Sequence, residues 1–361
     1  MVTQNRAGHN GRRRLKRATS AESMSLCARA FWVTRPGSGE VREQTLAAPA
    51  AGEALVQTLF SAVSRGTEAL VFQGRVPASE VERMRCPHQE GSFPGPVKYG
   101  YANVGRVLEG SSELCGRSVF CLYPHQDRYV VREAALVPLP DGVPEERAVL
   151  AANMETALNA LWDARPLAGD RISVVGGGVL GCLCAYLASR LPGVDVELVD
   201  VRSDRADVAA VLGFRFALPA QATPERDLVL HASASQEGLR TALGLAASDA
   251  EIIELSWFGD REVALPLGEA FHRRRLSLRS SQVGGVSPHA RRRFDHRARL
   301  ALALSLCRDP ALDRLFDSES PFEALPELMP ELAAPTSGVL CHRLRYSQTE
   351  EPCSASASAA T

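Results

Sequence analysis

The sequence predicts an α/β protein in which a compact β-rich domain precedes a doubly wound parallel sheet. Three observations lead to this fold class. Strand and helix patterns alternate from about residue 151 to 284, as a doubly wound sheet requires. A glycine-rich turn joins an apolar strand pattern to a helix pattern within residues 172–188. Short strand patterns separated by Gly and Pro fill residues 26–150.

The glycine-rich turn, ISVVGGGVLG at residues 172–181, is the strongest motif of the chain. Gly176, Gly178 and Gly181 match G-x-G-x-x-G, and Val179 and Leu180 fill the last two variable positions. The first glycine permits the turn, the second lets the backbone approach a pyrophosphate, and the third lets the helix pack closely on the strand. The free amides at the helix start, with the positive end of its dipole, would hold the diphosphate. The motif therefore predicts dinucleotide binding.

Asp200 ends the next strand pattern, residues 194–200, near the position of the acid that accepts the adenosine ribose hydroxyls. Its alternative role is to cap the following helix at Ser203. Asp200 favours NAD, whereas Arg202 and Arg205 just beyond it leave room for the 2′-phosphate of NADP. Further residues end strand patterns at the carboxyl edge, where ligands bind in such sheets, and are expected to contact the cofactor: Ala232, Ser233 and Ser256.

The division of the chain follows its composition. A chain of 361 residues is longer than one hydrophobic core usually accommodates, which indicates more than one domain. We expect a disordered basic tail over 1–25, a first domain over 26–150, a dinucleotide-binding domain over 151–284, a segment over 285–346 that returns to the first domain, and a disordered Ser/Ala tail over 347–361.

The charge balance indicates which classes of binding partner to expect, and the cysteine pattern indicates the redox environment. The chain has 41 basic and 42 acidic residues, so no global field favours nucleic acid or an anionic membrane. The basic runs at 271–275 and 291–293 are interpreted as solvated faces, and a small-molecule substrate is expected. Nine cysteines without a Cys-x-x-Cys pair argue against a disulfide framework and favour reduced thiols in a cytoplasmic protein. A homodimer is one assembly compatible with this organisation.

Four stretches together resemble the medium-chain dehydrogenase/reductase family from about residue 28 to 346. They are SRGTE at 64–68, GYANVGRV at 100–107, NMETALNAL at 153–161 and the glycine-rich turn. The resemblance implies a GroES-like β-barrel catalytic domain, a Rossmann domain, and hydride transfer with NAD or NADP in the cleft between them. It also implies that Thr156 lies near the nicotinamide.

The same resemblance exposes a departure. Zinc-using members have Cys-Gly-x-Asp where this chain reads residues 64–68, Gly-His-Glu where it reads 100–102, and a third ligand near Glu155. Only Glu155 keeps a ligand-like side chain, and the four-cysteine structural zinc lobe is missing. A zinc site needs three protein ligands of suitable chemistry, so we predict no zinc. The SRGTE variant looks similar to the branch that contains bacteriochlorophyllide dehydrogenase-like enzymes.

Without a metal, side chains must stabilise or protonate the oxygen that gains charge when a carbonyl accepts hydride. The candidates are Tyr101, Ser64, Lys98, Glu68, and Glu155 with a water. The alternatives are that Tyr101 is an ordinary half-buried aromatic residue, that Lys98 is a solvated loop residue, and that each glutamate pairs with an arginine such as Arg65. His125 is a further acid/base candidate, although a lone loop histidine is more often a surface residue.

The sequence thus predicts a zinc-independent NAD(P)-dependent oxidoreductase of the alcohol dehydrogenase type. Hydride would pass between the nicotinamide and a small-molecule carbonyl or alcohol. Two alternatives stay open: an NADPH-dependent alkene or quinone reductase, and a catalytically silent dinucleotide-binding protein.

Overall fold

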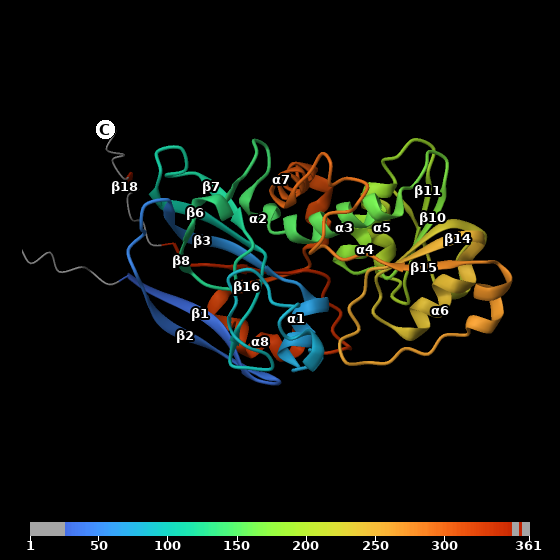
Figure 1. Ribbon diagram of the computed structural model, residues 1–361, viewed down its shortest axis with the longest axis horizontal. Helices are drawn as coiled ribbons and strands as arrows, with labels where there is room; N and C mark the ends of the chain where they lie inside the picture. The colour runs from blue at the N-terminus through green and yellow to red at the C-terminus, as the bar shows by residue number, and fades with distance from the viewer. Residues whose placement is uncertain (1–25, 349–353, 356–361) are drawn as a thin grey trace, which may run out of the picture.

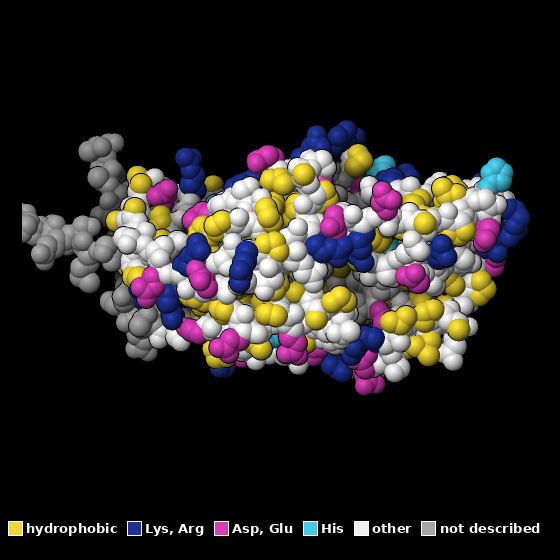
Figure 2. Space-filling view, turned by 90° about the horizontal axis from the view of Figure 1, so that it is seen from below, with side chains coloured by type: hydrophobic (Ala, Val, Ile, Leu, Met, Phe, Trp, Pro, Cys, Tyr) yellow, Lys and Arg dark blue, Asp and Glu magenta, His cyan; other side chains and the backbone are white. Residues whose placement is uncertain are grey.

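A computed structural model describes residues 26–348 and 354–355 of the chain. The predicted tail over 1–25 lies outside the described residues, as does most of the tail over 347–361. Two bodies lie side by side along the long axis, a β-rich one and an α/β one (Figure 1). On the face shown in Figure 2, basic and acidic side chains are interspersed. Within the described residues, no helix has the length and apolar character needed to cross a bilayer.

The β-rich body contains two sheets. The smaller has the order β2-β1-β5-β4, formed by Ser38–Leu46, Leu26–Arg35, Val97–Lys98 and Glu90–Gly91. The larger follows β16-β17-β3-β6-β7-β9, formed by Ser318–Pro321, His342–Arg345, Glu53–Val63, Asn103–Gly110, Ser118–Cys121 and Val137–Pro138. Two further strands join it: β8 (Arg128–Arg132) pairs with β3, and β18 (Ser354–Ala355) pairs with β6.

The α/β body is built on one parallel sheet of six strands in the order β12-β11-β10-β13-β14-β15. The strands are Arg215–Ala217, Asp195–Val199, Arg171–Val175, Arg226–His231, Ala246–Glu254 and Ser277–Ser280. Apolar runs such as Ile172–Val175 are buried because helices cover both faces of the sheet. The strand order reverses between β10 and β13, which places a crevice at their carboxyl ends. The predicted fold class is confirmed.

Eight α-helices surround these sheets in the described chain. They are α1 (Arg65–Phe72), α2 (Glu145–Ala148), α3 (Ala151–Ala164), α4 (Val179–Ala188), α5 (Arg205–Leu212), α6 (Gln236–Leu245), α7 (His296–Leu306) and α8 (Leu325–Leu332). Shorter helical turns are found at Ala78–Glu80, Glu133–Ala135, Pro219–Gln221, Leu267–Phe271, Pro310–Leu315 and Phe322–Ala324.

The last part of the described chain connects the two bodies. Helix α7 packs on α3, while β17 pairs antiparallel with β3, where His342 lies opposite Val63. Buried residues of α3, α4, α7 and β6 belong to one continuous core. The β-rich and α/β bodies therefore share apolar packing.

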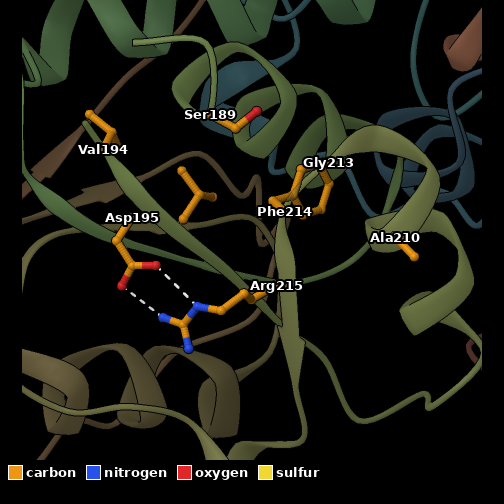
Figure 3. Close-up of a pocket in the computed structure, with 8 residues that line it drawn as sticks. Ser189, Val194, Asp195, Ala210, Gly213, Phe214 and Arg215 are labelled. Atoms are coloured by element: carbon orange, nitrogen blue, oxygen red, sulfur yellow. Dashed lines mark hydrogen bonds and ion pairs between the residues drawn. The ribbon is translucent and has the colours of Figure 1, made fainter. Parts of the chain in front are cut away.

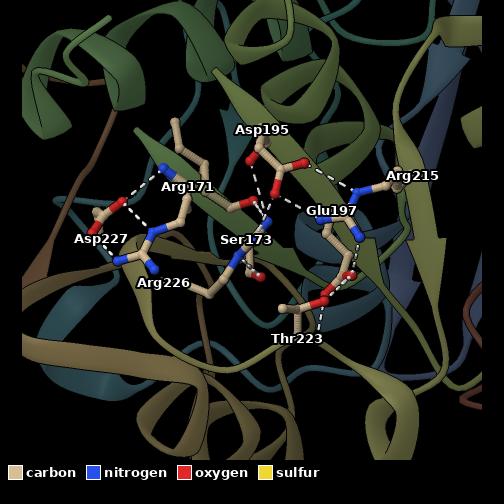
Figure 4. A network of polar contacts seen from close by, with 9 residues as sticks. Arg171, Ser173, Asp195, Glu197, Arg215, Thr223, Arg226 and Asp227 are labelled. Carbon is tan, nitrogen blue, oxygen red and sulfur yellow. Dashed lines mark hydrogen bonds and ion pairs between the residues drawn. The ribbon is translucent and has the colours of Figure 1, made fainter. Parts of the chain in front are cut away.

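Two local features differ from simple expectation. Seven of the described cysteines are free thiols, but Cys115 is disulfide-bonded, so the expectation of reduced thiols throughout is wrong. At the amino ends of the parallel strands, Arg226 is only 1% exposed and donates to Ser173 Oγ and to the backbone carbonyl of Ile172 (Figure 4). An arginine is stable there because its donors are satisfied by fixed acceptors.

Candidate active site

The glycine-rich turn has the geometry of a backbone cradle. Gly176 has φ +113°, and a Cβ on it would lie 2.6 Å from the amide nitrogen of Ser233. A Cβ on Gly181 would lie 1.8 Å from the carbonyl oxygen of Gly176. Gly178 differs, because a Cβ there would meet nothing within 4 Å. The first and third glycines are therefore required by protein packing, whereas the second faces open space where a ligand can approach.

Helix α4 starts directly after Gly178, whose lack of a side chain leaves the first amides of the helix without a cap. These amides and the turn form a site that suits a diphosphate group. Asp200 lies against the same turn, with Oδ2 accepting from Gly177 N at 2.6 Å and Oδ1 from Arg202 N at 2.8 Å. A carboxylate has about four acceptor positions, so it keeps room for two more donors. The residues present fit a dinucleotide.

Three arginines gather between α1 and α5. Arg65 donates to the carbonyl of Leu332, and Arg205 donates to the carbonyl of Gly338 at 2.8 Å. The pKa of Arg65 is lowered by burial first and then by the charge of Arg205 and Arg202, with Asp317 opposing. Arg202 is exposed and paired with Asp204 at 2.7 Å. The three arginines beside the turn are thus accompanied by the carboxylates of Asp204 and Asp317.

The predicted serines at the carboxyl edge are held in a polar network. His231 is fully buried at the end of β13, with Nδ1 2.7 Å from Glu254 Oε2 and Nε2 2.6 Å from Ser233 Oγ. Ser256 Oγ accepts from Ala234 N at 3.0 Å. Both serine hydroxyls are therefore occupied by neighbouring protein groups. The adjoining Ala232 donates its amide to Val175 O, which ties this loop to β10.

His231 and Glu254 were not predicted as site residues. Each looks like a strand residue in the sequence, and only the pairing of β13 with β14 brings them together. Thr156, which the family resemblance placed near the nicotinamide, donates Oγ1 to the carbonyl of Ala152 within α3. Its hydroxyl proton is therefore used inside its own helix.

Glu155, the one ligand-like residue predicted from the family pattern, is buried and paired. Arg299 Nε on α7 lies 2.9 Å from its Oε1. Burial raises the pKa of Glu155, and the charge and hydrogen bond of Arg299 act against that rise. The expected alternative of an ion pair with an arginine is the observed arrangement, with Arg299 as the partner.

Tyr101 and Ser64 come together at the start of α1. The Tyr101 side chain is half-buried and packs edge-on against Tyr99, with ring centroids 6.0 Å apart. Burial, followed by the charge of Glu68, raises the pKa of Tyr101 above the ordinary phenol value, while hydrogen bonds with Ser64 and Thr67 act in the opposite direction. Tyr101 is therefore a protonated phenol at neutral pH, which can donate a hydrogen bond.

Behind Tyr101 lies a chain of buried polar side chains. Glu68 Oε1 accepts from Ser64 N at 2.8 Å, and its Oε2 lies 2.8 Å from His125 Nε2. His125 Nδ1 lies 2.8 Å from Ser61 Oγ, which is 2.9 Å from the hydroxyl of Tyr346. His125 is 1% exposed, so its interpretation as a surface residue is wrong.

Lys98 is also buried rather than solvated, which overturns the loop alternative. Its ammonium group forms an ion pair with Glu90 and donates to Gln126 Oε1 at 2.6 Å. Burial lowers the pKa of Lys98, and Glu90 counteracts that effect. Both polar partners of the ammonium group, Glu90 and Gln126, are side chains of the β-rich body, so Lys98 has a structural role there.

The residues at the family's zinc-ligand positions do not fit a zinc ion. A serine, a protonated tyrosine and a glutamate bound to Arg299 are a poor donor set for zinc. Throughout residues 26–348 and 354–355, no three His, Cys, Asp or Glu side chains converge to hold a metal.

A surface pocket of about 310 Å³ lies away from this region (Figure 3). It is lined by residues at the amino end of β11 and after α5, including the ion pair of Asp195 and Arg215 at 2.7 Å. The glycine-rich turn lies at the opposite, carboxyl end of these strands. The pocket is therefore not part of the candidate site.

We expect substitutions of Gly181 and Gly178 to affect different properties, the first the stability of the protein and the second its affinity for NADH. Gly181→Ala forces a methyl group into the Gly176 carbonyl and should destabilise the protein by about 2 kcal/mol or more. Gly178→Ala, with ordinary φ −74°, should unfold like wild type in urea but bind NADH roughly tenfold more weakly, because its methyl group enters the ligand space. Urea unfolding and NADH fluorescence titration measure the two effects. Unchanged NADH affinity in Gly178→Ala would contradict the assigned crevice.

Comparison with known proteins agrees with this geometry. No protein-family model matches the sequence. D-guloside 3-dehydrogenases from Escherichia coli (strain K12) and Shigella flexneri are each 26% identical over 185 residues, which is 46% of this chain and 53% of the relative. The match therefore spans about half the length of these curated relatives.

Solved structures match over nearly their whole length. L-idonate 5-dehydrogenase from Escherichia coli superposes with a TM-score of 0.72 at 17% identity, covering 89% of this chain and 99% of that one. A short chain alcohol dehydrogenase from Escherichia coli CFT073 complexed with NADH reaches 0.69 at 14%, covering 88% and 99%. A protein from Sinorhizobium meliloti 1021 that is named a zinc-binding dehydrogenase and is bound to NADP reaches 0.69 at 16%, covering 89% and 99%. The chain has the two-domain fold of these dehydrogenases, a GroES-like domain joined to a Rossmann domain.

Proposed function

We propose that this protein is a zinc-independent, nicotinamide-dependent oxidoreductase that acts on a small-molecule alcohol or carbonyl. The observation that carries the proposal is the glycine cradle at the reversal point of the parallel sheet. There Gly176 and Gly181 admit no side chain, Gly178 faces open space, and the Asp200 carboxylate adjoins the turn. The cofactors in the NADH and NADP complexes of similar structures support the same ligand class.

NAD is the cofactor we favour. Asp200 retains acceptor positions for two ribose hydroxyls and would repel a 2′-phosphate. Arg202 and Arg205 could attract that phosphate, but Asp204 already lies 2.7 Å from the former and 3.6 Å from the latter. The net local charge therefore gives the 2′-phosphate little advantage.

A sugar or a sugar-derived polyol is the substrate class we infer. Two similar proteins are named as dehydrogenases of a D-guloside and of L-idonate, each of which carries several secondary hydroxyls. Polar groups around Tyr101, including Ser64 and Thr67, suit a substrate with several hydroxyl groups.

The mechanism we infer depends on hydrogen-bond donation by the protein. The bound nicotinamide supplies the hydride chemistry. Tyr101 holds its proton on Oη and donates a hydrogen bond to the substrate oxygen, which stabilises negative charge that develops there. Ser64 and Thr67 orient the Tyr101 hydroxyl through hydrogen bonds. The SRGTE segment at residues 64–68 thereby performs the positioning that a metal ion performs in zinc-using members.

A catalytically silent dinucleotide-binding protein is the second candidate. The pairing of Glu155 with Arg299 favours it, because the one retained ligand-like carboxylate serves an ion pair instead of chemistry. Turnover separates the candidates. NADH binding should be followed by NADH formation or consumption with hexitols, hexonates, glycosides or their keto forms. Binding without turnover on this panel and on alkenes and quinones would establish the silent protein.

Replacement of Asp200 tests the cofactor preference. Asp200→Ala removes the ribose acceptor, so NADH affinity should fall about tenfold while NADPH affinity changes little. Asp204→Ala is a matched control, because it removes a nearby carboxylate that pairs with Arg202 but does not contact the turn. This control should keep NADH affinity and gain NADPH affinity. Fluorescence titration gives both constants, and equal losses for the two cofactors in Asp200→Ala would refute the assignment.

Replacement of Tyr101 tests the proposed donor. Tyr101→Phe keeps the ring that packs on Tyr99 but removes the hydroxyl, so kcat should fall about 10- to 100-fold. NADH affinity should not change, because the cofactor site lies in the other body. Steady-state kinetics on the best substrate of the panel, with NADH titration as control, gives the answer. A wild-type kcat would exclude Tyr101 from the mechanism.

A further inference from the structure

The loop that joins α8 to β17, residues 333–340, reaches the two arginines that follow Asp200. Arg205 Nη2 donates to the carbonyl of Gly338 at 2.8 Å. A Cβ added to Gly338 would lie 2.9 Å from both Nη1 and Nη2 of Arg202. A single glycine of the β-rich body therefore adjoins both arginines of the α/β body.

This loop is anchored on both sides of the glycine. At its start, Gln73 Nε2 donates to the carbonyl of Ala333 at 2.7 Å. At its end, Asp317 Oδ2 accepts from Leu340 N at 2.6 Å, and Arg65 donates to the carbonyl of the residue before Leu340. The backbone of the loop therefore resists displacement, because several hydrogen bonds would have to break together.

The guanidinium group of Arg202 is held from two directions. Its Nε and Nη2 donate to the Asp204 carboxylate at 3.1 and 2.7 Å, and its far end lies against the backbone of Gly338. The Arg202 amide donates to Asp200 Oδ1 at 2.8 Å, which places the start of this side chain beside the proposed ribose acceptor. Two of its three guanidinium nitrogens are thus already paired with protein groups.

Arg205 is held by the same loop. It is only 6% exposed, and its Cγ packs against the glycine-rich turn, 3.1 Å from the position of a Cβ on Gly177. Its Nη2 is paired with the carbonyl of Gly338. A phosphate that bound Arg205 would have to take this donor away, and the half-buried carbonyl would then lose its partner, which costs free energy.

We propose that Gly338 is a specificity-determining residue for the cofactor, which disfavours NADPH by keeping Arg202 and Arg205 on the loop and away from a 2′-phosphate. This inference rests on the proposed oxidoreductase function. Glycine is required because a side chain at this position would occupy the space of the Arg202 guanidinium. The preference for NAD then has two sources, the charge of Asp200 in one body and the bare backbone of Gly338 in the other.

Gly338→Ala tests the proposal. The φ angle of Gly338 is not positive, so alanine adds no backbone strain. Its methyl group would meet the end of a flexible, partly exposed side chain, whereas the loop is anchored, so Arg202 is the group that moves. The released guanidinium can turn to a 2′-phosphate, whose charge exceeds that of the Asp204 carboxylate. The Kd of NADPH should fall about fivefold, while that of NADH stays unchanged.

Two further comparisons make the test specific. Gly285→Ala is the matched control, because its φ is also not positive and a methyl group there would meet nothing within 4 Å. It should leave both constants at their wild-type values. In a protein that carries Arg202→Ala, Gly338→Ala should lose its effect on NADPH, because the group that it displaces is missing. Fluorescence titration with NADH and NADPH at one fixed ionic strength gives all the constants.

Urea unfolding adds a readout that needs no cofactor. If Arg202 yields to the methyl group, Gly338→Ala should resist urea at least as well as wild type, because alanine also restricts the unfolded chain. A clear loss of stability would show that the anchored loop is displaced instead, and would refute the proposed mechanism.

The outcomes separate this inference from the function on which it rests. An unchanged ratio of NADH to NADPH affinity in Gly338→Ala would refute the role of Gly338 while leaving the proposed oxidoreductase function intact. A gain in NADPH affinity that persists in the Arg202→Ala protein would refute the action through Arg202. If wild type bound neither cofactor, the proposed function would fail, and the specificity role of Gly338 would fail with it.

Discussion

The contact between Gly181 and the carbonyl of Gly176 is the constraint on which the rest of the structure depends. It lets the start of α4 lie directly on the end of β10, where any side chain would separate them. The first turn of α4 then presents uncapped amides at the sheet reversal. Two neighbouring groups contact the turn. Asp200 accepts a hydrogen bond from Gly177 N, and the backbone of Ser233 lies against Gly176. The crevice at the sheet reversal is thus a consequence of backbone packing before it is a property of side chains.

Away from the glycine-rich turn, several ionisable side chains are held by contacts with each other. Glu155 is neutralised by Arg299, Lys98 by Glu90, and Glu68 is held by His125. Glu155, Arg299, Lys98, Glu68 and His125 are buried, and an unpaired buried charge would cost several kcal/mol, whereas Glu90 is exposed. These contacts hold several ionisable groups in pairs within the structure.

The sequence predicted the parts of the fold that carry local periodic signals. The strands β10, β11 and β13 each contain three closely spaced apolar residues, and α4 follows a recognisable turn, so these four elements were found near their observed bounds. Strand β2 was missed because its residues, SGEVREQTL, are mostly polar and it is defined by pairing with β1. Helix α1 was missed because only eight residues form it, and these were interpreted as a motif.

The side-chain environments could not be predicted, since they depend on partners far along the chain. Arg299 lies 144 residues from Glu155.

The salt bridge between Glu155 and Arg299 limits how the protein can be divided into separate parts. Arg299 also donates to Asn159 at 2.7 Å and to the backbone of Gly285. If residues 151–284 were produced alone, Glu155 and Asn159 on α3 would lose their contacts with Arg299. The face of α3 that α7 covers would also be exposed. A chimera that exchanges α3 must therefore take α7 along with it.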